Sequence, residues 1–178
     1  MPTDVHEDLL VGVIKSSEHN TYGKYPGIVR DVDDPDKLGR IRAEVPAIYG
    51  EDEWSPWAWP CLPFAGNKHG MNFIPEVESL VWIECAGGNI SIPIWCGMLW
   101  ADDERPEPQD NEARAIVSTA GHKVILDDKV GEVSIEHAEG AKLSMKKTEL
   151  AIELKAAKVS LTPNGISLTV NDVGMSIG

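Results

Sequence analysis

Several features that mark common protein classes are missing from this 178-residue sequence. No apolar run reaches the roughly 18 residues that a membrane-spanning helix needs. The first ten residues, MPTDVHEDLL, are acidic and lack the basic and apolar blocks of a signal peptide. The sequence therefore predicts neither a membrane span nor a Sec-type export signal.

Motifs for catalysis and metal binding are missing as well. The five histidines are scattered, without an H-E-x-x-H or H-x-H spacing, and there is no G-x-S-x-G and no glycine-rich phosphate loop. The three cysteines, Cys61, Cys85 and Cys96, match no metal-ligand spacing and lie among apolar residues. We therefore predict no enzymatic activity, no metal and no cofactor, and we interpret the cysteines as reduced thiols packed in a core.

Two groups of acidic residues resemble sites but fit them poorly. The turn that begins at Asp31 looks like the start of a calcium loop, yet Pro35 occupies the third ligand position. Three carboxylates are of the type that cleaves glycans, but nothing in the sequence places two of them around a cleft: Glu76, Glu78 and Glu84. An acidic turn and strand-face carboxylates are the interpretations we favour, and zymography on peptidoglycan tests the glycosidase alternative.

Basic residues are scarce, with 16 lysines and arginines against 29 aspartates and glutamates, a formal net charge of −13. The imbalance lies in the first part of the chain. Residues 1–114 carry 9 basic and 21 acidic side chains, a net charge of −12, whereas 115–178 carry 7 and 8, a net charge of −1. A surface of this sign repels phosphate backbones, so we predict no nucleic-acid partner.

Aromatic residues are confined to the front of the chain. All of them lie between Tyr22 and Trp100, and none occurs in the last 78 residues (178 − 100). The front part alternates between β-branched or aromatic clusters and turn residues, which predicts five short strands in an all-β, partly open barrel over residues 21–100. The expected strands lie within 25–32, 40–48, 57–66, 78–88 and 91–100.

Residues 101–114, ADDERPEPQDNEAR, carry no large apolar side chain and read as an acidic linker. From Ala115 onward, aliphatic residues fall two apart, and turn residues separate the groups, which predicts an array of short strands over 115–178. The groups are Val124/Leu126, Val133/Ile135, Leu143/Met145, Ile152/Leu154, Val159/Leu161, Ile166/Leu168/Val170 and Met175/Ile177.

The stretch AIELKAAK leaves a short helix open as an alternative, because Leu150, Leu154, Ala157 and Leu161 also fit one helical face. A lone ribbon without aromatic residues has too little core to stand by itself. We therefore predict that the tail finds its core in other copies, in a closed trimer that also removes exposed sheet edges.

The tryptophan cluster Trp54, Trp57 and Trp59 has two interpretations. The rings could form a carbohydrate platform, which would make the barrel a carbohydrate-binding or adsorption module. We favour the interpretation that the three tryptophans lie in the core or contact another subunit. His122, in TAGHKVILDD, is expected to be a turn or interface residue and not a ligand.

A family resemblance follows from four motifs in order: DPDKLGR at 34–40, PCLPFAG at 60–66, FIPEV at 73–77 and GHKVILDD at 121–128. Together they resemble the phage baseplate assembly protein V family, whose OB-fold domain belongs to the central spike of contractile tails and is related to the VgrG spikes of type VI secretion. The tail also resembles the continuation of that family into an intertwined trimeric β-helix.

The resemblance implies a homotrimeric, non-enzymatic spike in the tail baseplate of a virion or related particle, synthesised in a bacterial cytoplasm. The lysozyme domain and the fused hub of some members have no counterpart here, so residues 1–20 are expected to dock on a separate hub protein. The H-x-H iron site of some short spikes is also missing, which implies a separate PAAR-like tip protein. Its expected contacts are Gly174, Met175, Ser176, Ile177 and Gly178.

Overall fold

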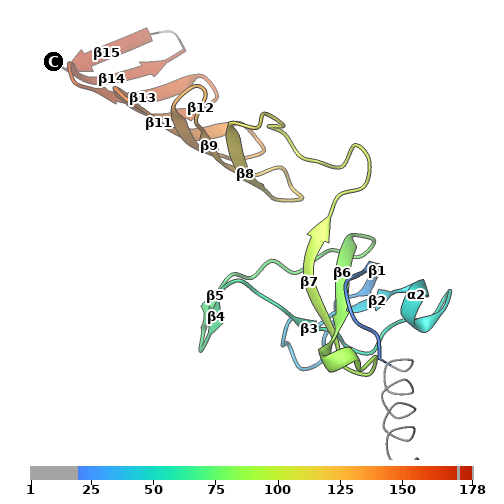
Figure 1. Ribbon diagram of the computed structural model, residues 1–178. Helices are drawn as coiled ribbons and strands as arrows, with labels where there is room; N and C mark the ends of the chain where they lie inside the picture. The colour runs from blue at the N-terminus through green and yellow to red at the C-terminus, as the bar shows by residue number, and fades with distance from the viewer. Residues whose placement is uncertain (1–19, 172, 178) are drawn as a thin grey trace, which may run out of the picture. The chain divides into compact units, whose positions relative to one another are not determined.

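A computed structural model describes residues 20–171 and 173–177. The chain divides into two compact units between Asp103 and Glu104, which we call the front unit and the tail unit (Figure 1). Both units are built from strands, so the all-β prediction is confirmed. The expected hub-docking segment, apart from Asn20, lies outside the described residues, as does Gly178.

The front unit contains a curled five-stranded sheet in the order β2-β1-β6-β7-β3 (Figure 1). Its pairs are antiparallel except for β3 and β7, which run parallel. The strands are β1 Tyr25–Asp31, β2 Arg42–Glu44, β3 Trp59–Pro60, β6 Leu80–Cys85 and β7 Pro93–Leu99. A short 3-10 helix, η1 (Ala86–Gly88), follows β6.

Alternation along the strands produces the core of the front unit. In β6, every second side chain is buried, beginning with Val81, because successive residues point to opposite faces of a sheet. These side chains pack with residues of the other strands in one hydrophobic cluster: Val29, Ile41, Ala43, Val45, Ala58, Val81, Ile83 and Trp95. The indole N–H of Trp95 donates to the Gly39 carbonyl at 3.1 Å, so the ring is buried with its polar atom satisfied.

Two expected strands are shorter than the sequence predicted. The segment 40–48 forms only the three residues of β2 and then a short helix, α2 (Pro46–Tyr49). Pro46 stands at the start of that helix, where its fixed φ suits the first turn and its missing N–H is not needed. The segment 57–66 forms only β3 before the chain leaves the barrel.

The chain leaves the barrel as a projecting loop, residues 61–73, which we call the arm (Figure 1). Its strands β4 (Ala65–Gly66) and β5 (His69–Gly70) pair only with each other in a two-stranded ribbon. Lys68 adopts a positive φ of 62° in the connecting turn. A Cβ at Gly66 would lie 2.4 Å from Nε2 of His69, so a larger residue there would require the exposed His69 ring to move.

The tail unit is one eight-stranded antiparallel sheet in sequence order (Figure 1). Its strands are β8 Ala113–Val117, β9 Lys123–Asp127, β10 Glu132–Glu136, β11 Ala141–Lys146, β12 Glu149–Leu154, β13 Ala157–Thr162, β14 Gly165–Val170 and β15 Val173–Ile177. The helix considered for residues 150–161 does not form. A turn with Lys155 at φ 53° separates β12 from β13, so the period-two pattern prevails over the helical one.

The cysteine prediction is correct in part. All three thiols are free, but Cys85 alone is buried, while Cys96 is half-buried and Cys61 is exposed at the start of the arm. Burial raises the pKa of the Cys85 thiol. Among the described residues, no helix is both long enough and apolar enough to cross a bilayer.

Candidate interaction surfaces

One face of the tail sheet carries continuous rows of aliphatic side chains, which we call the apolar face. Residues directly opposite each other across an antiparallel pair point to the same side, so the strand register aligns the groups that the sequence places two apart. The first row is Ile116, Val124, Ile135, Leu143, Ile152, Val159, Leu168 and Met175. The second is Leu126, Val133, Met145, Leu150, Leu161, Ile166 and Ile177. A third, shorter row is Leu154, Ala157, Val170 and Val173.

The described part of the chain leaves the apolar face uncovered. Ile152 and Leu154 are each 57% exposed, and Met175 is 62% exposed. Ala151 is the one buried hydrophobic residue that the described tail unit contributes, and it points to the other side of the sheet. Contiguous apolar surface on this scale marks an interaction site in soluble proteins.

On the opposite face of the tail sheet, which we call the polar face, the buried polar atoms find their hydrogen-bond partners within the chain. A central row of small side chains runs along it, and its buried members are Ser134, Ser144, Ala151 and Ser160. Ser160 and Ser167 share a hydroxyl hydrogen bond of 2.7 Å. Among the described residues, every buried side-chain nitrogen and oxygen has a hydrogen-bond partner.

Lysine and glutamate side chains flank the small row and pair across strands. Lys158 Nζ lies 2.9 Å from Glu149 and 3.1 Å from Glu153, and Lys142 Nζ lies 2.5 Å from Glu132. The hydrogen bond to Glu149 is the main cause of the raised pKa of Lys158, and the bond from Lys142 lowers the pKa of Glu132. This face therefore has the properties of a solvent-facing surface.

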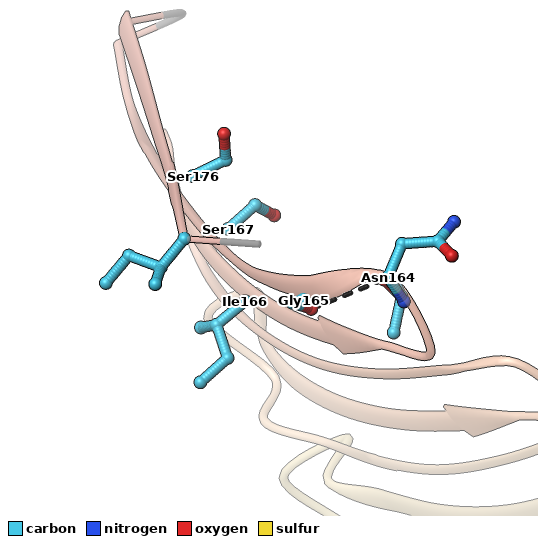
Figure 2. Close-up of a pocket in the computed structure, with 7 residues that line it drawn as sticks. Asn164, Gly165, Ile166, Ser167 and Ser176 are labelled. Carbon is cyan, nitrogen blue, oxygen red and sulfur yellow. Dashed lines mark hydrogen bonds between the residues drawn. The ribbon is translucent and has the colours of Figure 1, made fainter.

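The predicted tip contacts lie on the last strand, which forms one edge of the tail sheet. Ser176 pairs with Ser167 on the polar face, while Ile177 pairs with Ile166 on the apolar face. Figure 2 shows the two serines pointing to one side of the strands and Ile166 to the other. A hollow of about 200 Å³ lies here, lined by Thr162, Asn164, Gly165, Ile166, Ser167, Ser176 and Ile177.

On the front unit, the tryptophans form a ladder with two arginines that the sequence analysis did not single out. Arg42 lies 5.5 Å from the Trp54 ring and 5.9 Å from the Trp57 ring. Arg40 lies 5.8 Å from Trp57 and 5.4 Å from Trp59. Trp57 thus contacts both guanidinium groups, at distances typical of cation–π contacts. Trp54 and Trp59 remain 44% and 45% exposed.

Arg40 is held in the ladder by the acidic turn. Its Nη2 donates to Asp34 at 2.5 Å, and the Asp34 carboxylate also accepts backbone N–H groups of Asp36, Leu38 and Arg40. The bond from Arg40 is the main cause that holds the pKa of Asp34 well below its usual range. The Asp34 oxygens are therefore occupied by protein donors, which agrees with the acidic-turn interpretation and not with a calcium loop.

The remaining candidate residues are placed in structural contacts. Glu78 pairs with Arg30, and Glu84 pairs with Lys24. The His122 ring lies 4.4 Å from that of His137, and each Nδ1 accepts a backbone N–H, from Ala138 and Glu139 respectively. Within residues 20–171 and 173–177, no group of three or more histidine, cysteine or acidic side chains is placed to hold a metal.

The curled five-stranded sheet and its single core define the front unit as a small β-barrel-type domain. Residues 25–100 match the family model of the type VI secretion system and phage-baseplate injector OB domain. The front unit therefore carries this injector OB domain, which supports the resemblance to the baseplate family, and its role is a structural one related to the baseplate. No curated protein matches the chain.

Proposed function

We propose that this chain is the central spike of a contractile injection apparatus, a homotrimeric and non-enzymatic needle that pierces the target cell envelope. The observation that carries the proposal is the apolar face, which spans all eight strands of the tail and has no cover within the described chain. The injector OB domain, which precedes the tail in the sequence, supplies the baseplate context.

Assembly through the apolar faces accounts for the different character of the two sides of the tail sheet. Three tails facing a common axis enclose the aliphatic rows, and the polar faces with their lysine–glutamate pairs remain in water. The rows contain no aromatic side chain, so they suit a narrow interior where a ring does not fit. The number three rests on the resemblance of the tail to a trimeric β-helix.

The mechanism is mechanical. Contraction of a sheath drives the needle forward, and a stiff trimer concentrates the force on a small area of the envelope. In this arrangement residues 1–20 join the spike to the hub, and the terminal residues Gly174–Gly178 seat a PAAR-like tip protein on the edge strand β15. Deletion of 174–178 is expected to abolish tip-protein capture and to leave the trimer intact; retained capture would refute this contact.

Native mass spectrometry tests the assembly directly. Three chains of 19.4 kDa give a trimer of about 58 kDa, whereas a sandwich of two tails gives about 39 kDa. An unheated SDS gel lane should show the trimer band until boiling, because enclosed sheets unfold slowly. A chain that stays monomeric at all concentrations would overturn the spike and favour the adsorption module. Titration with envelope glycans, with Trp54→Ala as control, would then decide that alternative.

Two neighbouring substitutions on β14 sharpen this test. Leu168→Asp places a charge on the apolar face and should abolish the trimer, since burying an unpaired carboxylate costs several kcal/mol per chain. Thr169→Asp, one residue further, lies on the polar face opposite Lys158 and should leave the trimer intact. Equal effects of both substitutions would show that the apolar face is not the trimer interface.

A further inference from the structure

The arm is fixed to the barrel at its root. The Cys61 N–H donates to the Trp95 carbonyl at 2.8 Å, and the side chains of Leu62 and Ile74 pack against the hydrophobic core of the front unit. Gly39, at a φ of 76°, leaves room for Ile74, because a Cβ there would lie 3.1 Å from the Ile74 Cδ1 and the isoleucine side chain would have to shift. The direction in which the arm leaves the barrel is therefore set by core packing.

Beyond its root the arm has no core of its own. Phe64, Met71 and Phe73 are 55%, 41% and 46% exposed. The tip is held by the turn, by the bond from the Met71 N–H to the Phe64 carbonyl and by the ring contact of Phe64 with His69. An isolated two-stranded ribbon is at best marginally stable in water. Its apolar side chains thus indicate a surface that binds a partner.

The charge of the arm indicates which partner fits. Residues 60–75 contain no acidic side chain and one basic residue, Lys68 at the tip. The rest of the described front unit, residues 20–59 and 76–103, carries 5 basic and 13 acidic residues, a net charge of −8. The arm can therefore approach the acidic surface of another front unit without repulsion between carboxylates, and it projects from the barrel with its apolar side chains exposed.

We propose that the arm of each chain docks on the front unit of a second copy and so links the three OB domains at the base of the spike. The proposal rests on the trimer proposed above, which tethers three front units close together. Phe64, Met71 and Phe73 provide the apolar contact, and Lys68 provides the charge complement. Because the arm and its acceptor are different surfaces, the contact is head-to-tail and closes into a ring of three.

A photo-crosslinker at the arm tip tests the contact in the purified full-length chain. With Asn67→p-benzoylphenylalanine, illumination should join chains covalently, and the attachment points should map to residues 20–103 of the second copy. Attachment points confined to the tail unit would overturn the proposal. The same probe combined with Leu168→Asp should give no joined chains, because the trimer is then lost.

A pair of adjacent substitutions provides the matched control. Phe73→Ser should reduce the crosslinking yield several-fold while the tail keeps the chains trimeric, whereas Asn72→Ser should leave the yield unchanged. A trimer in native mass spectrometry that yields no joined chains would overturn the arm contact and leave the spike standing. A monomer would overturn both.

Discussion

In both units of this chain, apolar side chains alternate along the strands, but the two units differ in whether other parts of the same chain cover these side chains. In the front unit, Val81 and Ile83 of β6 point into a core that the same chain encloses completely. In the tail unit, the equivalent side chains of β12, such as Ile152, point to a face that the described chain leaves open. Folding of the front unit thus buries its own core, whereas the apolar face of the tail stays uncovered within the described chain.

This difference shows where each unit takes its stability from. All aromatic residues lie in the front unit, where Trp95 belongs to the buried core and Tyr25 and Tyr49 pack against it. The tail has no aromatic residue, and its side chains are arranged so that one face is polar, with its buried polar atoms hydrogen-bonded, and the other carries the aliphatic rows. Association is therefore expected to matter little for the core of the front unit and greatly for the tail.

The largest effect should come from truncating one side chain in each unit. Ile83→Ala removes a fully buried side chain and should lower the free energy of unfolding of the front unit by about 2–5 kcal/mol. This loss should be the same at different protein concentrations. Because all six tryptophans lie in the front unit, urea unfolding followed by tryptophan fluorescence reports on it selectively.

Ile152→Ala is the matched substitution in the tail. It should leave the free energy of unfolding of the front unit unchanged. It should shift the trimer–monomer equilibrium toward monomer, and the shift should be larger at lower protein concentration. If Ile152→Ala instead destabilised the chain equally at all concentrations, the tail would hold its own core, and the contrast between the units would be wrong.

An intermediate effect is expected from Asp34→Asn in the front unit. The carboxylate binds Arg40 and three backbone N–H groups, so its loss should lower the thermal midpoint clearly more than Asp36→Asn, whose side chain is 65% exposed. Thermal scans of the two variants in parallel measure this difference. Equal midpoints would mean that the turn does not depend on the buried carboxylate.

The pH dependence of this interaction follows from the direction of the pKa shift. The pKa of Asp34 is lower in the folded chain than in the unfolded one, so the unfolded chain binds a proton first as the pH falls. The stabilisation is therefore full above the ordinary aspartate pKa of about 4 and decreases as the pH drops below it. Asp34→Asn should remove this part of the acid sensitivity.

The smallest effect should come from the polar face of the tail. Lys158→Ala breaks the pairs with Glu149 and Glu153, and partly exposed pairs of this kind contribute about 0–1 kcal/mol each. The difference from the unchanged protein should shrink in high salt. Lys147→Ala, at the exposed turn between β11 and β12, is the control and should have no measurable effect. A large loss for Lys158→Ala would mean that this face is also buried in an interface.

Several features of the fold could be predicted because they depend on local pattern. The period-two groups of the tail became strands, and Ile152 and Val159 are direct neighbours on one face. The helix alternative failed because the turn at Lys155 interrupts it. The expected strand over 57–66 was too long, since no local signal distinguishes a barrel strand from a segment that leaves the barrel after Pro60.

The candidate surfaces were predicted less completely. The tryptophans were identified, but their alternation with Arg40 and Arg42 was not, because it depends on how a turn and two strands come together. Arg40 and Arg42 are two residues apart, as are residues on one face of a strand, and this spacing could have indicated that they share a face. The contact between His122 and His137 likewise comes from the pairing of β9 with β10, which separated positions do not reveal.

The sequence by itself determined the all-β class, the change of character after Trp100 and the membership of the front unit in the injector OB-domain family, because alternation, composition and motifs are properties of short segments. Only the tertiary structure decided that the aliphatic pairs align into continuous rows on one uncovered face, that Asp34 anchors Arg40 beneath two tryptophans, and that the arm projects from the barrel. Strand register and core packing join residues that are distant in the chain, and these contacts depend on three-dimensional neighbours that no short segment specifies.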